Sequence, residues 1–241
     1  MADSYRTEGF ILKKSNRGEA DQLFTIYTKD FGKIEILGKG IRKIKSKLRS
    51  GADIFCFSEI EFIQGKTYKT LTGASTIEKF PNLRKNLIKL RIANKIAEVI
   101  DNLIRGQEKD EEIFNFLNDT FKKLNNLSLA ICHWSSFYYY FIWNLLSILG
   151  YKINLYQCVI CHRKLTPQKL YFCPREGGII DFNCSQKISD KEIISPEIIK
   201  IIRLFLKRDW ETLLKIKPND DYQKPLRAVS ESYFQYYKKK E

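Results

Sequence analysis

The first part of the chain, up to about Ile77, alternates apolar and polar residues in short runs that are separated by turn residues. Alternation with a period of two is typical of strands with one buried face, and β-branched and aromatic residues favour strands. The pattern predicts five strands, at Gly9 to Lys14, Gln22 to Thr28, Ile34 to Ile41, Asp53 to Gln64 and Lys66 to Thr76. Five strands in about seventy residues are typical of a small, partly open Greek-key barrel of the OB type, and an SH3-like barrel is the alternative.

The period of the apolar residues changes after Phe80-Pro81-Asn82. It becomes helical, with apolar side chains at Leu83, Leu87, Leu90, Ile92, Ala93, Ile96, Ala97, Ile100 and Leu103. Similar patterns predict helices from Glu111 to Leu124, from Leu129 to Leu149 and from Leu226 to Tyr237. Ser195-Pro196-Glu197 opens another helix, because serine caps free amides and proline suits the first turn. That helix ends before Asp209 or continues past Trp210.

These patterns together predict an α+β chain. An OB-fold β-barrel occupies residues 1–80, and an α-helical domain follows over residues 81–241. A cysteine-bearing loop at about residues 156–186 is inserted in the helical domain.

One segment of the predicted helical domain, Leu127 to Gly150, has no Asp, Glu, Lys or Arg and is long enough to cross a bilayer. Its middle nevertheless carries polar side chains, at His133, Ser135, Ser136, Tyr138, Tyr139, Tyr140 and Asn144. Such groups are costly in hydrocarbon when they are unpaired. The segment is therefore predicted to be the buried central helix of the helical domain.

Charge adds a functional constraint, because the 241 residues carry a formal net charge of +14. A potential of this sign attracts polyanions, so nucleic acid is the first predicted partner and an acidic membrane surface the second. A membrane partner is disfavoured, since neither terminus shows a lipidation motif. The start of the chain lacks the apolar stretch of a secretory signal, which predicts a cytoplasmic protein with reduced cysteines.

Four of the six cysteines follow the pattern C-x2-C-x11-C-x10-C, at Cys158, Cys161, Cys173 and Cys184. The first pair has the spacing of a zinc knuckle. The second pair needs the chain to double back, and Gly177-Gly178 supplies a flexible reversal. Four thiolates close a tetrahedral site, so the pattern predicts one structural Zn²⁺ ion rather than a catalytic one.

The alternative for these cysteines is a set of free buried thiols, which behave as small hydrophobes. A redox pair is disfavoured, because no βαβ pattern surrounds the C-x-x-C motif. His162 adjoins Cys161 and could substitute as a ligand, although neighbouring side chains usually point apart. Cys56 and Cys132 lie in apolar stretches and are predicted core residues.

A basic run without acidic residues follows the third predicted strand, with cations at Lys39, Arg42, Lys43, Lys45, Lys47 and Arg49. Like charges this close repel one another unless a polyanion neutralises them, so these six residues are the predicted nucleic-acid contacts, and a solvated charge run is the alternative. Gly38 and Gly40 would let backbone amides approach phosphates. Contact through phosphates would depend on salt and be largely blind to sequence.

The predicted barrel also holds eight aromatic residues, Phe10, Phe24, Tyr27, Phe31, Phe55, Phe57, Phe62 and Tyr68. Most of them must form the core, and one or two could be stacking platforms for bases.

Residues for catalysis are scarce. The two histidines, His133 and His162, have no nucleophile or carboxylate partner in a recognisable motif. Neither G-x-x-x-x-G-K-[ST] nor G-x-G-x-x-G occurs, so phosphate chemistry at a P-loop is not supported. The sequence predicts a binding protein that is not an enzyme. A nuclease with convergent carboxylates is the enzymatic alternative.

Several motifs occur in a fixed order along nearly the whole chain. The first are Thr7-Glu8-Gly9-Phe10-Ile11-Leu12, Gly18-Glu19-Ala20-Asp21, Tyr27-Thr28-Lys29-Asp30-Phe31-Gly32-Lys33 and Gly38-Lys39-Gly40-Ile41-Arg42-Lys43, leading to Ser46. The later ones are Leu145-Leu146-Ser147-Ile148-Leu149-Gly150-Tyr151, then Leu155 and Cys158-Val159-Ile160-Cys161. In this order the motifs resemble the RecO family.

The resemblance implies an OB fold, a helical domain with an inserted zinc loop, and a role in recombinational DNA repair by the RecF pathway. Proteins of this family are non-catalytic mediators that bind single- and double-stranded DNA and anneal complementary strands. They pair with RecR, contact the C-terminal tail of single-strand-binding protein, and help RecA onto the coated strand. The resemblance also implies a cytoplasmic, nucleoid-associated protein, and the basic run coincides with the family's proposed DNA face.

The chain departs from the family pattern at the metal. The family usually places two more cysteines, three apart, shortly after the Gly-Gly pair, and the first of these positions is Asp181 in this chain. Cys184 matches the second position, so either Cys173 supplies the fourth thiolate or Asp181 ligates through oxygen. An OB-fold RNA-binding chaperone or a translation factor remains the alternative function, because the same barrel and charge would serve RNA.

Overall fold

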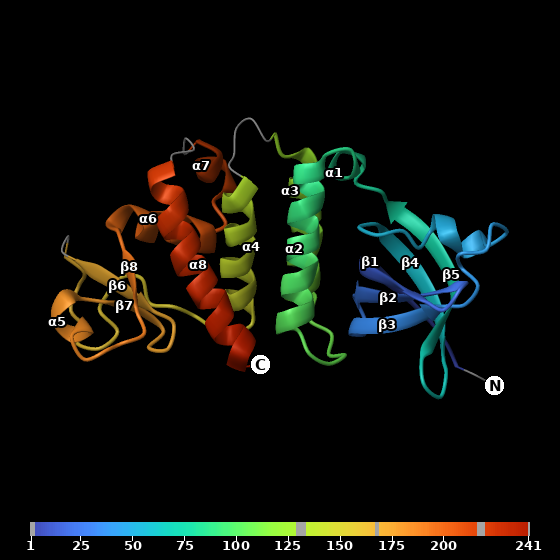
Figure 1. Ribbon diagram of the computed structural model, residues 1–241, viewed down its shortest axis with the longest axis horizontal. Coiled ribbons are helices and arrows are strands. Elements are labelled where there is room, and N and C mark those ends of the chain that lie inside the picture. Colours follow the sequence, from blue (N-terminus) through green and yellow to red (C-terminus); the bar gives the residue numbers. More distant parts are fainter. Residues whose placement is uncertain (1–2, 129–133, 167–168, 216–219, 241) are drawn as a thin grey trace. The chain divides into compact units, whose positions relative to one another are not determined.

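The computed structural model describes residues 3–128, 134–166, 169–215 and 220–240 (Figure 1). It contains two compact units, Met1–Asn126 and Leu127–Glu241. Cys132, His133 and the start of the helix predicted from Leu129 lie outside the described residues.

A closed barrel of five strands opens the first unit. The strands are β1 (Ser4–Arg17), β2 (Asp21–Thr28), β3 (Gly32–Gly38), β4 (Phe57–Gln64) and β5 (Lys69–Glu78), in the order β1-β2-β3-β5-β4. Neighbouring strands are antiparallel, except that β3 and β5 pair in parallel. The arrangement confirms the predicted OB-like barrel, and its closure leaves no free sheet edge.

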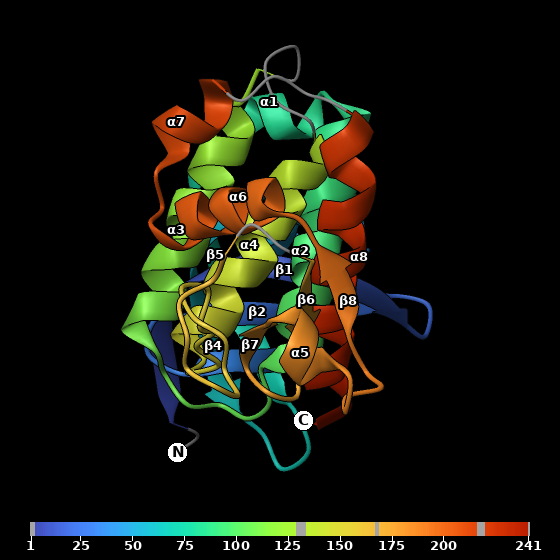
Figure 2. The same ribbon diagram turned by 90° about the vertical axis from the view of Figure 1, so that its left-hand side faces the viewer.

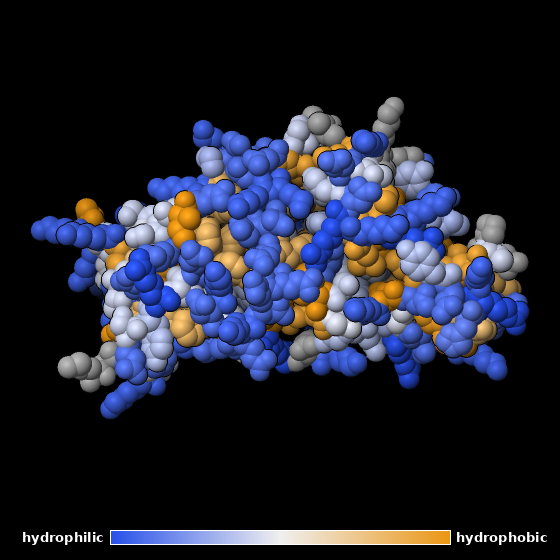
Figure 3. All heavy atoms as spheres, turned by 180° about the vertical axis from the view of Figure 1, so that it is seen from behind, coloured by the Kyte–Doolittle hydropathy of each residue, from blue (hydrophilic) through white to orange (hydrophobic). Residues whose placement is uncertain are grey.

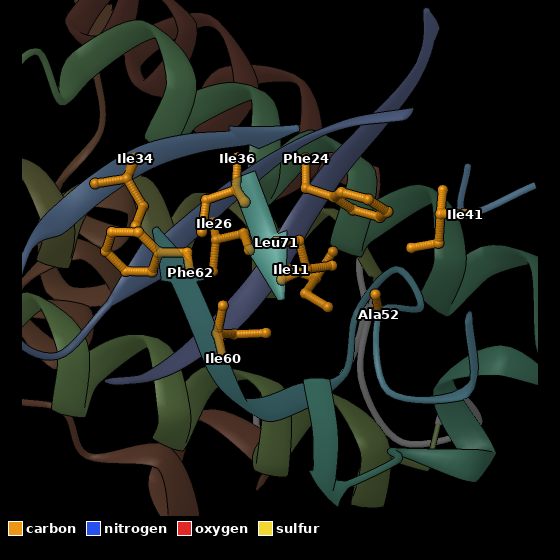
Figure 4. Close-up of a cluster of buried hydrophobic side chains, with 10 residues drawn as sticks. All are labelled: Ile11, Phe24, Ile26, Ile34, Ile36, Ile41, Ala52, Ile60, Phe62 and Leu71. Carbon is orange, nitrogen blue, oxygen red and sulfur yellow. The ribbon is translucent and has the colours of Figure 1, made fainter. Parts of the chain in front are cut away.

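Apolar side chains from all five strands fill the barrel interior (Figure 4). They are Ile11, Phe24, Ile26, Ile34, Ile36, Ile60, Phe62 and Leu71, joined by Ile41 and Ala52. Ile26 lies opposite Ile11 on one neighbouring strand and Ile34 on the other, so branched side chains meet across both ladders. Ile41 and Ala52 come from the segment between β3 and β4, and they tie that segment into the core.

The outer face of the barrel is also buried along β1 and β2, because it packs against helix α3 (Glu111–Asn126). Phe10 is next to Ile11 on β1 and therefore points outward, where its ring stacks on Phe121 with centroids 5.4 Å apart. Tyr27 on β2 likewise faces outward, and its hydroxyl donates to the Asp110 carbonyl over 3.5 Å. Burial on both faces explains why all the residues of β2 from Leu23 to Thr28 are buried, the polar Thr25 and Thr28 included.

Two further helices complete the first unit, α1 (Pro81–Arg84) and α2 (Leu87–Leu103). Asn86 caps α2, since its side chain accepts hydrogen bonds from the amides of Ile88 and Lys89. The predicted boundary after residue 80 separates strands from helices along the sequence, whereas packing groups α1, α2 and α3 with the barrel.

The second unit combines helices with a small sheet (Figure 2). The helices are α4 (Trp134–Ile148), α5 (Phe182–Ser185), α6 (Pro196–Leu206), α7 (Trp210–Lys215) and α8 (Asp220–Lys240). Strands β6 (Leu170–Cys173), β7 (Gly178–Ile180) and β8 (Glu192–Ile194) form a sheet in the order β7-β6-β8.

Most of the described part of the charge-free segment forms the helix α4, as predicted, and two of its polar side chains find partners inside the protein. The indole Nε1 of Trp143 donates to Ser230 Oγ on α8 over 2.9 Å, and the Asn144 amide donates to the Phe205 carbonyl on α6 over 2.9 Å. Among the described residues, no helix combines the length and the apolar character that a bilayer crossing requires. Seen from behind, the surface is mostly hydrophilic, with small apolar patches between the polar side chains (Figure 3).

Two helix ends of the second unit refine the predictions. Ser195 caps α6 as predicted, and the helix ends at Leu206, because Arg208 takes a left-handed φ of +56° before α7 begins at Trp210. The last helix begins at Asp220 rather than Leu226, so it contains Pro225. Pro225 is the sixth residue of this helix, so it lacks the amide that would donate to the Asp221 carbonyl, and its ring crowds that carbonyl.

Candidate nucleic-acid interface and metal cluster

The six predicted nucleic-acid contacts all lie in the basic loop, which we define as residues 39–50. This loop follows β3 and ends in a short 3-10 helix, Lys47–Ser50. Lys39, Arg42, Lys43, Lys45, Lys47 and Arg49 are all exposed. Within the described ranges none of the six forms an ion pair. Their charges are therefore free to meet an external anion.

The first end of the basic loop is anchored to the turn between β1 and β2 and to the first residue of β2. The amide of Gly40 donates to Asp21 Oδ1 over 2.7 Å, and the amide of Arg42 donates to the Ala20 carbonyl over 3.0 Å. Between them, Ile41 is only 2% exposed and belongs to the barrel core. The fixed backbone explains how the exposed side chains of Lys39 and Arg42 flank a buried residue.

The second end of the basic loop is held against β4 and β5. Ser58 Oγ donates to the Gly51 carbonyl over 2.8 Å, and Thr76 Oγ1 donates to the Ser50 carbonyl over 3.2 Å. Gly51 lies so close to β5 that a Cβ atom there would be 2.0 Å from the carbonyl oxygen of Ala74. Only glycine fits at this position, because the obstacle is backbone.

The amide of Gly40 donates to Asp21, so this amide is not one of those that could approach a phosphate. Gly40 has a φ of +61°, so its role is to turn the chain after β3. At Gly38, a Cβ atom would lie 2.9 Å from the ring of Phe24, and glycine is needed there for packing. Any phosphate contact by the basic loop would therefore come chiefly from side chains.

A pocket of about 420 Å³ opens beside the basic loop. Its lining residues are Lys14, Gln22, Ile41, Arg42, Arg49, Ala52 and Asp53. Lys14 is a cation that the sequence did not single out, since it lies 25 residues before the predicted run. The pocket joins positive charge from β1 to that of the loop.

The carboxylate of Asp53 neutralises part of the positive charge that lines this pocket. Its carboxylate accepts from Lys14 Nζ over 2.8 Å and from Arg84 Nη1 over 2.6 Å. Partial burial acts to raise the pKa of Asp53, but the hydrogen bonds and charges of the two cations outweigh it and lower the pKa to about 2. Asp53 is consequently ionised at any physiological pH, and it links the strand β1 to the helix α1.

Most of the barrel aromatics are core residues, as predicted. Phe10, Phe24, Tyr27, Phe55 and Phe62 are at most 1% exposed, and Phe31 and Phe57 are partly buried. Tyr68 is the exposed one of the eight, at 41%, in the turn between β4 and β5.

The cysteine-bearing loop of the second unit forms a tight turn at Cys158 and Cys161. Residues Gln157 and Lys164 pair as an antiparallel bridge at its base. The amide of Cys158 donates to the Arg163 carbonyl over 2.9 Å, and His162 takes a left-handed φ of +58°. This is the geometry that the C-x2-C spacing predicts for a knuckle.

Asp181 completes the site from the other side of the loop. It is the N-cap of α5, where its Oδ1 accepts from the amide of Cys184 over 2.8 Å. Its Oδ2 accepts from the thiol of Cys161 over 3.0 Å. The hydrogen bonds from Cys161 and Cys184 lower the pKa of Asp181 to about 2, so its carboxylate is ionised and oriented toward the thiols.

Four possible metal-ligand atoms converge at this point, from Cys158, Cys161, Asp181 and Cys184, all within 4.8 Å of one another. A tetrahedral zinc site requires edges of roughly 3.5–3.8 Å between such ligands, so the spacing fits with small adjustments. Burial, followed by hydrogen bonds with Cys161, Cys158 and Asp181, raises the pKa of Cys184 to about 12, which is a penalty on its thiolate form. A bound cation would remove this penalty, and three thiolates with one carboxylate suit zinc.

Cys173 lies outside that group of four. It is a fully buried residue of β6 and packs with Cys158 and Ile180 in an apolar cluster. The geometry therefore matches the alternative ligand set with Asp181, in which Cys173 is a core thiol. His162 is exposed and also lies outside the group. Cys56 is buried, as predicted, and accepts a hydrogen bond from Arg84 Nη2 over 3.0 Å.

The fold and the two sites define a class of protein: an OB-like barrel with an exposed basic loop, followed by a helical unit that carries a cysteine-rich cluster. Comparison with known families agrees with this class. Residues 1–80 match the family model described as Recombination protein O N terminal, and residues 84–240 match Recombination protein O C terminal.

Individual relatives are named DNA repair protein RecO. One from Dehalococcoides mccartyi (strain 195) is 33% identical over 216 residues, which cover 89% of this chain and 83% of the relative. One from Thermoanaerobacter sp. (strain X514) is 31% identical over 212 residues, covering 88% and 84%. One from Alkaliphilus metalliredigens (strain QYMF) is 28% identical over 228 residues, covering 95% and 91%. The chain belongs to the RecO family of DNA repair proteins.

Proposed function

We propose that this chain is a non-catalytic recombination mediator of the RecF pathway, which binds single- and double-stranded DNA and anneals complementary strands. The observation that carries the proposal is the basic loop, whose six cations are exposed and free of ion pairs among the described residues. Membership of a DNA repair family supports DNA as the polyanion.

Annealing needs no covalent chemistry, because the barrier is electrostatic. Two DNA strands repel each other through their phosphates, and a protein that neutralises phosphates lowers this repulsion and releases counterions. The anchored ends of the basic loop hold its cations on one side of the barrel, so Lys39 and Arg42 face the solvent while Ile41 stays in the core. Binding through such contacts would accept any base sequence.

As a mediator, the chain would act together with protein partners. We propose RecR as a direct partner, the C-terminal tail of single-strand-binding protein as a second, and RecA as the protein whose loading is assisted. This function places it in the cytoplasm, associated with the nucleoid. We also propose a functional boundary after residue 80, because the two family models divide the chain at residues 80 and 84.

We propose that the metal cluster holds one structural Zn²⁺ ion through Cys158, Cys161, Cys184 and Asp181. The ion would supply charge neutralisation and a crosslink between the knuckle and the start of α5. Four protein ligands leave no open position for water, so the site has no hydrolytic role.

Annealing of complementary strands precoated with single-strand-binding protein tests the main proposal. The variant Arg42→Glu, Lys43→Glu should anneal such strands much more slowly than the unmodified chain, while circular dichroism shows the same fold. Annealing at an unchanged rate would overturn the role of the basic loop. Preference for RNA strands over DNA strands at equal salt would favour the RNA chaperone, and cleavage of labelled strands with Mg²⁺ or Mn²⁺ would contradict the non-catalytic function.

A further inference from the structure

Tyr156 is a large aromatic side chain on the surface of the second unit, and the metal cluster and the basic loop do not use it. It lies two residues before Cys158 and is 61% exposed. Exposed single apolar residues are common and need no explanation on their own. Tyr156 differs from such residues because a neighbouring side chain covers one face of its ring.

The guanidinium of Arg203 covers one face of the Tyr156 ring, with its carbon 4.2 Å from the ring centroid. Arg203 comes from α6, and its Nη2 also donates to the carbonyl of Leu155, a residue that is only 1% exposed. The cation is thus fixed to the backbone next to the ring that it covers. The cation is attracted to the ring face that it covers, and the 61% exposure of Tyr156 leaves ring surface accessible to a second planar group.

The backbone of Tyr156 is fixed as well. Its amide donates to Asn154 Oδ1 over 2.9 Å, and its carbonyl accepts from the amide of Leu165 over 3.5 Å. The next residue, Gln157, pairs with Lys164 at the base of the knuckle. A ring held in this way loses little conformational entropy when a ligand stacks on it.

The charge around Tyr156 favours an anionic partner. Residues 155–165 contain no Asp or Glu, and Arg163 and Lys164 are both exposed, Lys164 being the bridge partner of Gln157. On α6, Lys200 is exposed one turn before Arg203. Neither Arg163 nor Lys164 forms an ion pair with any residue that the structure describes.

We propose that Tyr156 is a stacking platform for an unpaired base, and that Arg163 and Lys164 contact the phosphates of the same strand. The ligand is a single-stranded nucleic acid, because the alternation of aromatic and cationic side chains matches its alternation of bases and phosphates. Bases in a duplex are stacked on both faces, so this surface is selective for single strands. It is a second contact surface, in a different compact unit from the basic loop.

The test uses the full chain and a fluorescent oligothymidylate, with affinity measured by anisotropy at several salt concentrations. Tyr156→Ala should weaken binding about fivefold or more, since base stacking on an aromatic side chain is worth at least that much. The slope of log affinity against log salt should not change, because no phosphate contact is lost. Tyr156→Phe should bind like the unmodified chain.

Two further measurements make the outcome decisive. Tyr156→Leu keeps an apolar side chain over Arg203 but has no ring, so it should lose affinity like the alanine variant without loss of stability. Binding to a duplex of the same length should be unaffected in all three variants. Unchanged affinity of the leucine variant for the single strand, or equal losses for strand and duplex, would overturn the proposal.

The result is independent of the role proposed for the basic loop. The variant Arg163→Gln, Lys164→Gln should reduce the salt slope for single strands by about 1.4, at about 0.7 for each lost contact. An unchanged slope would overturn the phosphate contacts of Arg163 and Lys164. If neutralising Arg42 and Lys43 has no effect on binding while Tyr156→Leu does, the basic loop fails as an interface and the second surface stands.

Discussion

Removing two positive charges from the basic loop should weaken strand binding in a salt-dependent way. The double variant Arg42→Gln, Lys43→Gln removes two exposed cations and leaves the buried anchor Ile41 in place. Each neutralised phosphate on a single strand contributes about 0.7 to the slope of log affinity against log salt, so the slope should fall by about 1.4. At roughly 0.15 M salt this amounts to an affinity loss of about tenfold.

The measurement is a titration of a fluorescent oligonucleotide at four or more salt concentrations, and its control is a second variant with the same net charge. Arg105→Gln, Lys109→Gln removes two exposed cations between α2 and α3. That connection lies at the opposite end of β3 from the basic loop, because a Cβ atom at Gly32 would be 2.2 Å from the carbonyl of Glu108. The control should keep nearly the full slope and affinity.

Equal losses in the two double variants would refute the reasoning, because binding would then respond to total charge rather than to the position of the cations. Thermal unfolding should be the same for both variants, since neither pair of side chains takes part in an ion pair among the described residues.

Three further predictions concern stability and metal content. Asp53→Asn should lower the free energy of unfolding at neutral pH by about 1 kcal/mol, because the pKa shift from 3.8 to about 2 has to be discounted for a side chain that is 39% exposed. The pKa of Asp53 is lower in the folded than in the unfolded chain, so this contribution is complete above about pH 4 and is lost as the pH falls toward 2. Urea unfolding curves of the two proteins should therefore converge in acid. A difference that stays constant with pH would contradict a stabilising role of the ionised Asp53 carboxylate. Gly51→Ala should destabilise the protein by about 1–3 kcal/mol, because its Cβ atom would meet the Ala74 carbonyl at 2.0 Å, and an unchanged melting temperature would count against this contact. In metal analysis we expect about one zinc ion per unmodified chain, much less for Asp181→Ala and the full content for Cys173→Ala, and the reverse result would assign Cys173 as the ligand.

The alternation of apolar residues was enough to place all five barrel strands, but not their ends. The third strand was predicted to reach Ile41, whereas β3 ends at Gly38. Ile41 is buried because the basic loop folds into the core, not because it belongs to a strand. Similarly, β4 begins at Phe57 rather than Asp53, after Phe55 takes a left-handed φ of +54°. Periodicity reports burial and says little about which residues form ladder hydrogen bonds.

The spacing of the cysteines predicts where the metal cluster lies, but it does not decide whether Cys173 or Asp181 is the fourth ligand. Spacing alone does not show that β6 turns Cys173 into the apolar interior. A local signal for the alternative was present, since Asp181 precedes Cys184 by the same three positions that separate Cys158 from Cys161. The carboxylate is favoured further because the helix α5 uses it as a cap.

Interactions between distant segments were beyond the reach of sequence patterns. Asp53 joins Lys14 and Arg84, which are 39 and 31 residues away, and no periodicity relates them. Arg203 reaches the Tyr156 ring across 47 residues for the same reason. Such contacts depend on how elements pack, and short-range patterns carry no information on this.

The buried side chains of Ile41 and Ala52 fix the chain to the barrel core on either side of residues 42–51. Between these two anchors, residues 43–47 are largely exposed and make few contacts with the barrel, so their identity should have little influence on folding. We therefore expect that this stretch can be replaced by sequences of equal length from other RecO proteins. Such chimaeras would show how the side chains of the loop determine substrate preference while the barrel stays the same.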